Sequence, residues 1–143
     1  MLNPKKIFLG TIGYAVITFP LAYLWHLVAF KNTYDQLGYI SREQPIIAFG
    51  FASIVIQGIL LATIYPLLCG RMPFSKGAAT FILLMGTYHW TMHVLAAAAK
   101  QHIEPLPTWF GIESIYLIIQ FTMGGLLMAF IYRKANNSSV QIT

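Results

Sequence analysis

Four long apolar stretches follow one another along the chain, and polar residues gather in the short segments between them. The stretches cover about residues 7–30, 45–69, 77–99 and 108–132. Each is about 23 to 25 residues long, and about 20 apolar residues in a helix cross the hydrocarbon core of a bilayer. The pattern predicts an all-α fold with four transmembrane helices, in which residues 1–143 form a single integral membrane domain.

The connections between the stretches are short and cover residues 31–44, 70–76 and 100–107. Short connections join antiparallel neighbours, so we expect an up-and-down four-helix bundle. Residues 135–143 are mostly polar and include Asn136, Asn137, Ser138 and Ser139. We expect this segment to be a flexible polar tail.

Composition and charge agree with a membrane protein and suggest its orientation. Hydrophobic residues make up 57% of the chain and charged residues only 9%. Six basic residues lie on one side of the predicted spans: Lys5, Lys6, Arg71, Lys76, Arg133 and Lys134. The other side has three basic and three acidic residues: Lys31, Arg42, Lys100, Asp35, Glu43 and Glu104. The positive-inside rule therefore places both termini in the cytoplasm, and we expect the protein in the bacterial inner (plasma) membrane. Topology and anionic lipid explain the net charge of +5, so no nucleic-acid partner is expected.

Polar side chains inside the spans form two levels when they are placed by depth at about 1.5 Å of rise per residue. The outer level lies about 7 to 11 Å from the midplane and draws on the first, third and fourth helices: His26, His93 and Glu113. The middle level lies within about 2 Å of the midplane and draws on the second, third and fourth helices: Gln57, His89 and Gln120. Because residues three, four or seven apart share a helix face, the two levels are aligned. We expect a polar interior that opens toward the outer side.

These residue types leave three functions open. Two imidazoles and a carboxylate are suitable ligands for zinc or iron, so His26, His93 and Glu113 form a candidate divalent-metal site. Histidine also transfers protons near neutral pH, and His89, His93 and Glu113 can line a proton path, although four helices would have to form an oligomer to transport anything. The third function is structural, in a non-catalytic accessory subunit of a larger membrane complex.

No enzymatic activity is indicated, because the chain has no set of nucleophile, base and orienting residue, no phosphate-binding loop and no suitably spaced pair of carboxylates. The single cysteine, Cys69, excludes an intramolecular disulfide.

Two short motifs of the chain resemble motifs of a known group of proteins. Trp25-His26 closes the first span and is followed by Tyr34-Asp35-Gln36-Leu37-Gly38, and the third span contains Thr87-Tyr88-His89-Trp90-Thr91-Met92. They resemble motifs of small bacterial four-span membrane proteins grouped as domains of unknown function. These proteins have Tyr-x-x-x-Leu-Gly, which is one residue longer than the segment from Tyr34 to Gly38. One family among them has Thr-Tyr-Asp-Leu-Thr-Asn in its third span. The last span of that family begins with an acidic residue, which Glu113 resembles. The resemblance implies the four-span topology without an activity, and it singles out Tyr88, His89, Thr91 and Glu113. Together with Gln57 and Gln120, the first three are our candidates for a ligand or proton path.

Overall fold

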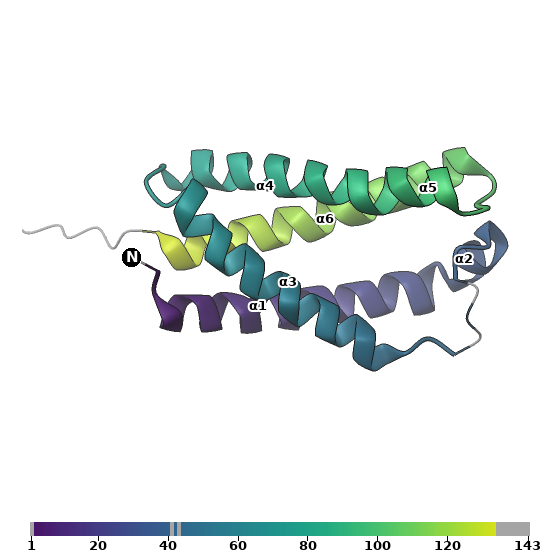
Figure 1. Cartoon of the computed structure of the whole chain (residues 1–143), viewed down its shortest axis with the longest axis horizontal. Helices are drawn as coiled ribbons and strands as arrows, with labels where there is room; N and C mark the ends of the chain where they lie inside the picture. Colours follow the sequence, from purple (N-terminus) through teal and green to yellow (C-terminus); the bar gives the residue numbers. More distant parts are fainter. Residues whose placement is uncertain (1, 41, 43, 134–143) are drawn as a thin grey trace, which may run out of the picture.

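The computed structural model describes residues 2–40, 42 and 44–133, so the expected tail at residues 135–143 lies outside the described residues. The elements in chain order are α1 (Pro4–Leu24), η1 (Trp25–Ala29), α2 (Lys31–Leu37), α3 (Ile47–Leu68), α4 (Phe74–Trp90), η2 (Thr91–Leu95), α5 (Ala96–Lys100) and α6 (Leu106–Tyr132). Helix α1 continues into η1, and α4 continues into η2 and α5, so each series forms one long helix. With α3 and α6 they make four helices long and apolar enough to span a membrane. The described residues contain no strand. The predicted all-α fold with four spans is confirmed (Figure 1).

The four long helices alternate in direction, so the start of α1 and the end of α6 lie at the same end of the bundle (Figure 1). We call this the terminal end, and we call the opposite end, where α2 and α5 lie, the α2 end. The helix pairs with extensive packing are α1 with α3, α1 with α6, and α4 with α6. Helix α3 crosses α1 obliquely and reaches α4 at the terminal end (Figure 1). Helices α1 and α6 therefore form the centre of the bundle.

A close approach of backbones allows α3 to cross α1. Gly58 of α3 lies on Thr11 of α1, where a Cβ atom would come within 3.1 Å of Thr11 Cα and 3.2 Å of its carbonyl oxygen. Small residues at such crossings let membrane helices pack closely without a hydrophobic driving force. The crossing therefore depends on the missing side chain at Gly58.

One element was not predicted. Helix α2 forms a single short helix in the first connection and ends at Gly38, whose φ of 73° is the left-handed conformation common at helix C-termini. This connection is polar and lies outside the spans, so the hydrophobic pattern carries no signal for it. Its position matters, because α2 brings Tyr34 into the interior, where it is fully buried.

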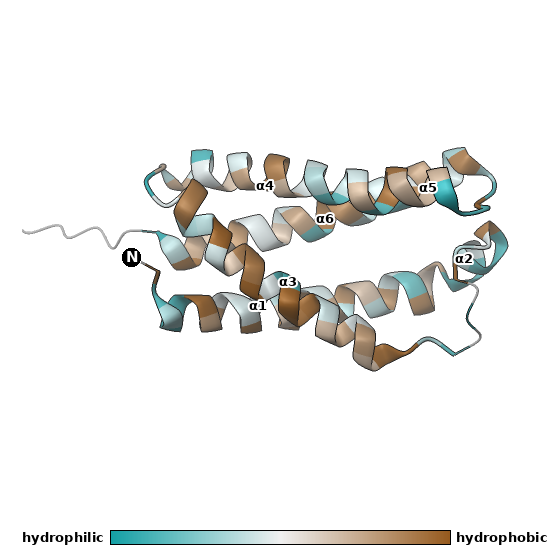
Figure 2. Ribbon diagram, in the orientation of Figure 1, coloured by the Kyte–Doolittle hydropathy of each residue, from teal (hydrophilic) through white to brown (hydrophobic). Residues whose placement is uncertain are grey.

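The outward faces of the long helices are apolar, as expected for contact with lipid. Large exposed hydrophobic side chains occur on every span, among them Phe8, Phe49, Leu83 and Ile118. Figure 2 shows hydrophobic colours along the helices and hydrophilic colours mainly near the two ends and on α2. The protein therefore has the composition and the apolar surface of an integral membrane protein, and its orientation in the membrane stays a prediction.

Candidate functional site

Glu113 is the centre of the most polar part of the interior. It lies on α6 about 10 Å from the start of that helix, and its side chain is 0% exposed. Tyr34 of α2 donates its hydroxyl hydrogen to Glu113 Oε1. Nε2 of His26 lies 3.3 Å from Oε1, and Nε2 of His93 lies 2.8 Å from Oε2. The three residues of the predicted outer level therefore meet, and we call them, together with Tyr34, the Glu113 cluster.

Both histidines of the cluster lie in π-helical turns. In η1 the amide of Phe30 bonds to the carbonyl of Trp25, and in η2 the amide of Ala96 bonds to the carbonyl of Thr91, each five residues back. Such turns are rare and insert one extra residue into a helix, which changes the direction of the side chains there. The two spans beside Glu113 therefore share a local distortion at the residue that reaches the carboxylate.

Backbone carbonyl groups in and beside the π-helical turns accept hydrogen bonds from side-chain donors. Trp109 Nε1 donates to the carbonyl of Val94 in η2 at 3.0 Å, and Nδ1 of His26 lies 2.9 Å from the carbonyl of Ala22 just before η1. Both carbonyls can only accept, so the bond fixes the orientation of each ring. The rings at the cluster are thus held by the backbone as well as by Glu113.

Counting donors and acceptors locates the protons of the cluster. Trp25 Nε1 donates to the Tyr34 hydroxyl at 3.1 Å, which leaves the Tyr34 hydrogen for Glu113. His26 Nδ1 must carry a hydrogen because the carbonyl of Ala22 has none. A hydrogen bond between His26 Nε2 and Glu113 Oε1, which lie 3.3 Å apart, needs one further hydrogen, and either atom can carry it.

Aromatic rings surround the cluster on several sides. The ring of Tyr116 meets that of His26 edge-on, with centroids 4.6 Å apart. On the other side the ring of Tyr39 packs against Trp109 at 4.4 Å, and both rings lie 5.9 Å from that of His93. Packing of this kind lowers the local dielectric constant and strengthens the interactions at the carboxylate.

This environment raises the pKa values of two tyrosines outside the spans. Burial, followed by the negative charge of Glu113, raises the pKa of Tyr34 well above its ordinary value of 10.0. The same two causes, in the same order, raise the pKa of Tyr39 to about 12. Both phenols therefore keep their hydrogens throughout the physiological pH range, and Tyr34 stays a donor to Glu113.

A second polar network lies deeper in the bundle. Gln120 Nε2 of α6 donates to the hydroxyl of Tyr14 at 2.6 Å, and this hydroxyl donates to Gln57 Oε1 of α3 at 3.2 Å. Two residues of the predicted middle level, Gln57 and Gln120, are thus joined through Tyr14 of α1, which sequence reasoning missed. One turn along α1, the buried hydroxyl of Thr18 has no hydrogen-bond partner among the described residues.

The remaining predicted residues do not join either network. His89 is half-buried, with its ring 5.3 Å from Phe121 and 5.6 Å from His93. Tyr88 is 65% exposed on the outer surface of α4, and Thr91 is also exposed and bonds to the carbonyl of Tyr88. The structure therefore leaves Tyr88 and Thr91 facing the lipid and His89 beside the Glu113 cluster without a bond to it.

The metal site predicted at His26, His93 and Glu113 stays a prediction. In the part of the chain that the structure describes, no group of three or more His, Cys, Asp or Glu side chains is placed to hold a metal ion. The two Nε2 atoms approach different oxygens of the carboxylate. They are arranged as hydrogen-bond partners of Glu113, and a shared ligand position would require the rings to move.

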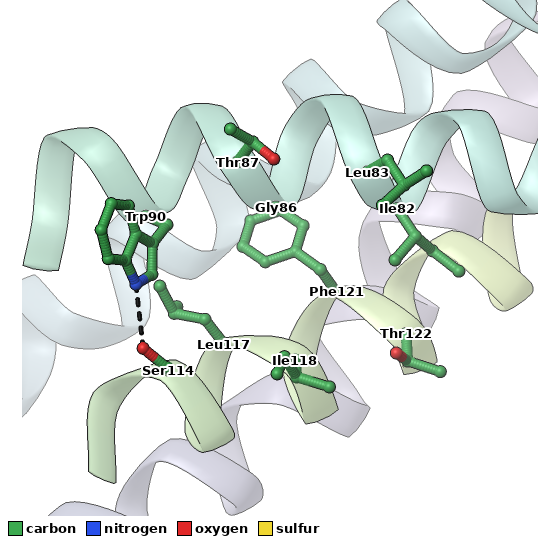
Figure 3. Close-up of a pocket in the computed structure, with 10 residues that line it drawn as sticks. All are labelled: Ile82, Leu83, Gly86, Thr87, Trp90, Ser114, Leu117, Ile118, Phe121 and Thr122. Carbon is green, nitrogen blue, oxygen red and sulfur yellow. Dashed lines mark hydrogen bonds between the residues drawn. The ribbon is translucent and has the colours of Figure 1, made fainter. Parts of the chain in front are cut away.

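A cavity of about 400 Å³ between α4 and α6 does not include the cluster. Figure 3 shows its lining, in which Trp90 Nε1 donates to the hydroxyl of Ser114 at 2.9 Å. Most of the other lining residues are apolar, and Leu83 and Ile118 at its edge are exposed. This cavity therefore opens to the lipid and supplies no titratable group.

Comparison of the chain with protein-family models, with curated proteins and with solved structures found no match in any of the three. The resemblance to four-span families of unknown function therefore stays a prediction, and function has to be inferred from the Glu113 cluster itself.

Proposed function

We propose that this integral membrane protein binds and releases a proton at the Glu113 cluster, in exchange with water at the α2 end. One observation carries the proposal: a fully buried carboxylate has two imidazoles and a phenol as its hydrogen-bond partners. An ionisable group within a span costs about 3 kcal/mol on insertion scales, and such groups commonly form proton relays. Histidine is the side chain that changes charge near neutral pH.

His93 provides the connection to water. Its side chain is 27% exposed, compared with 18% for His26 and 0% for Glu113. Its Nε2 faces Glu113, so a proton taken up at Nδ1 can be passed on by release from Nε2. The route enters at the α2 end, where α5 and the connection to α6 lie.

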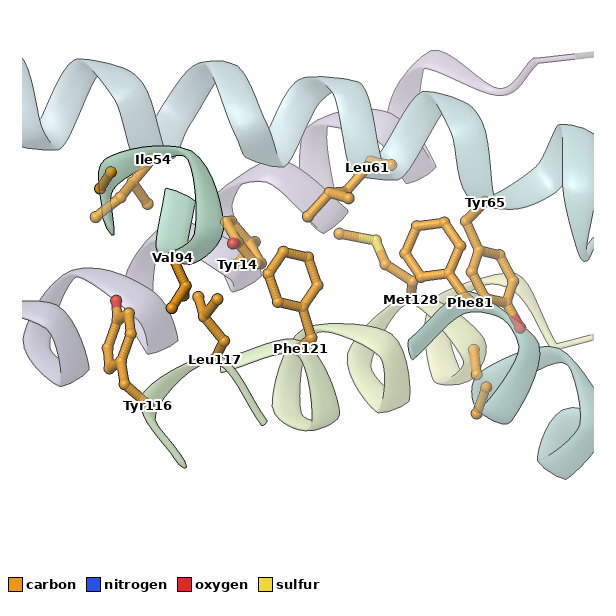
Figure 4. Packing of buried hydrophobic residues seen from close by; sticks show 14 of the residues in the cluster. Tyr14, Ile54, Leu61, Tyr65, Phe81, Val94, Tyr116, Leu117, Phe121 and Met128 are labelled. Carbon is orange, nitrogen blue, oxygen red and sulfur yellow. The ribbon is translucent and has the colours of Figure 1, made fainter. Parts of the chain in front are cut away.

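Polar groups continue from the cluster toward the middle of the bundle. Glu113, Tyr116 and Gln120 are all buried on α6 at helical spacing, and Gln120 leads to the Tyr14 network. Beyond Tyr14 most of the buried side chains are apolar: Figure 4 shows Phe121, Leu61, Met128 and Phe81 in turn toward Tyr65 at the terminal end. One chain therefore offers half a path. Passage across the whole membrane would require a homo-oligomer or a larger membrane complex.

Infrared difference spectroscopy tests the proposal. Spectra of the purified protein in mild detergent at pH 5 and pH 8 should differ in carboxyl and imidazole bands. The part of this difference that comes from Glu113 should disappear in Glu113→Gln, because the amide keeps the shape of the side chain but cannot exchange the proton. The matched control is Glu104→Gln, which removes an exposed carboxyl group from the same end and should leave the Glu113 bands in place.

A Glu113→Gln spectrum identical to that of the unsubstituted protein would contradict the proposal. Calorimetric titration with zinc separates the alternative. Stoichiometric zinc binding that is lost in both His93→Ala and Glu113→Gln would assign the same residues to a metal and would replace proton binding as the function. Proton binding predicts no such stoichiometric site.

A further inference from the structure

We propose a second site at the terminal end, where a pocket binds the phosphate group of an anionic phospholipid. The pocket has a volume of about 350 Å³ and lies between the end of α3, the turn that leads to α4, and the end of α6. Two arginines and two tyrosines line it: Arg71, Arg133, Tyr65 and Tyr132. We call it the arginine pocket. It is remote from the Glu113 cluster and does not depend on the function proposed for that cluster.

The charge of the pocket favours an anion. Arg71 lies on the turn after α3, and Arg133 directly follows α6. Lys6 lies over the ring of Tyr132, with Nζ 5.4 Å from the centroid, and adds a third positive charge beside the pocket. Three acidic residues belong to the α2 half: Asp35, Glu104 and Glu113. Among the residues that the structure describes, no carboxylate therefore competes for the arginines, and basic pockets at the ends of membrane helices bind lipid head groups.

The hydroxyl group of Tyr65 is a polar group in the lining of the pocket. Its side chain is only 3% exposed, and its hydroxyl makes no hydrogen bond to any described residue. Figure 4 shows this hydroxyl directed away from Met128 and the core. Gly77 of α4 leaves room for it, since a Cβ atom there would lie 2.6 Å from the hydroxyl oxygen. By contrast, the hydroxyl of Tyr132 is already bonded to the carbonyl of Ala62 at 2.7 Å. The Tyr65 hydroxyl therefore offers a donor in the lining of the pocket, and a phosphate oxygen bound there can accept its hydrogen.

The surroundings favour a lipid over a free anion. Exposed aromatic side chains of Phe74 and Phe130 flank the pocket, and the guanidinium group of Arg133 lies over the ring of Phe130 at 4.1 Å. Arginine thus sits at the boundary between apolar surface and water, where phospholipid phosphates lie. The first turn of α4 begins at Phe74 and presents its free amides at the same level, which adds to the preference for negative charge. A phospholipid can place its phosphate in the pocket and its acyl chains along the exposed apolar surface.

Native mass spectrometry of the delipidated protein, titrated with phosphatidylglycerol and with phosphatidylcholine, tests this site. We expect preferential binding of phosphatidylglycerol. The double variant Arg71→Gln/Arg133→Gln should lower this affinity roughly thirtyfold, at about fivefold for each cation. Tyr65→Phe keeps the ring in the core and removes only the hydroxyl, so its expected loss of about fivefold reports the site without an effect on folding.

The matched control is Lys31→Gln/Arg42→Gln, which removes the same number of charges at the α2 end. Equal affinity in the arginine double variant and the unsubstituted protein would overturn the proposal. A loss of the same size in the control would also overturn it, because attraction would then depend on net charge alone. Displacement of the lipid by millimolar inorganic phosphate would reassign the pocket to the free anion, whereas unchanged lipid binding would support the phospholipid.

Discussion

Tyr34 connects the short helix outside the membrane to the carboxylate inside it. Its hydroxyl accepts from Trp25 Nε1 and donates to Glu113, so one oxygen atom links η1, α2 and α6. Because the group is fully buried, water cannot replace either partner. Tyr34 therefore determines both the position of α2 and the number of hydrogens available to Glu113.

We predict that Tyr34→Phe lowers the free energy of unfolding by about 1 to 3 kcal/mol, the usual cost of leaving buried polar groups without a partner. Unfolding in mixed micelles of mild detergent and sodium dodecyl sulfate, followed by circular dichroism, measures this change. Tyr23→Phe is the matched control, because Tyr23 is exposed on α1 and makes no hydrogen bond to the described residues; it should change stability by less than about 0.5 kcal/mol. Equal effects of the two variants would show that the Tyr34 hydroxyl is not part of a stabilising network.

Depth along the helices predicted part of the site correctly at the residue scale. His26, His93 and Glu113 were placed at one level and do meet, because rise per residue is nearly constant in a helix. Depth gives no information on direction around the helix, however. Tyr88 and Thr91 were included through the resemblance to four-span families, and both are exposed. Tyr34 was missed because it lies in a connection without hydrophobic periodicity.

At the scale of elements, the π-helical turns decide which side chains face Glu113. An extra residue in a turn rotates the following segment by about 100° relative to an uninterrupted α-helix. His89 lies before η2 and His93 within it. Their rings still lie 5.6 Å apart, as a spacing of four predicts, but only His93 bonds to Glu113. A π-helical turn costs free energy relative to a regular α-helix, and tertiary hydrogen bonds such as that from Trp109 to Val94 offset this cost. Because those bonds come from residues distant in sequence, the local sequence carries no reliable signal for such a turn. The four spans themselves were predictable because their apolar length is a property of the sequence alone.

The crossing of α1 and α3 provides a direct test of helix packing. We predict that Gly58→Ala destabilises the protein by about 1 to 3 kcal/mol, because the new methyl group meets the backbone of Thr11, which cannot move aside cheaply. The control is Gly50→Ala on the same helix, where a Cβ atom would meet nothing within 4 Å. That variant should be neutral or more stable by up to about 1 kcal/mol, because alanine favours helix.

The same unfolding measurement in detergent micelles compares the two glycine variants. If Gly58→Ala proved as stable as Gly50→Ala, the close contact between α1 and α3 would be absent in the membrane protein. A destabilised Gly58→Ala variant that keeps its helical content would locate the effect in packing between helices, since propensity alone predicts the opposite sign.

At the scale of the whole molecule, the two ends differ in chemistry. Among the described residues, the acidic side chains lie in the α2 half together with the Glu113 cluster, and the terminal end holds the arginine pocket. The apolar layer of Leu61, Phe81, Phe121 and Met128 separates them. Under the two proposals, the molecule exchanges protons at one surface and binds lipid phosphate at the other, and its orientation decides which compartment and which leaflet each site meets.

We predict that the terminal end faces the cytoplasm, because basic residues near the ends of spans are retained on that side. Two cysteine variants in a Cys69→Ala background test this in intact bacterial cells: Asn32→Cys on α2 and Ser75→Cys at the start of α4, both at exposed positions. A membrane-impermeant maleimide should label the first in intact cells and the second only after the membrane is disrupted. The reverse pattern would contradict the predicted orientation. The Glu113 cluster would then exchange protons with the cytoplasm, and the arginine pocket would face the outer leaflet, although the contacts that define each site would be unchanged.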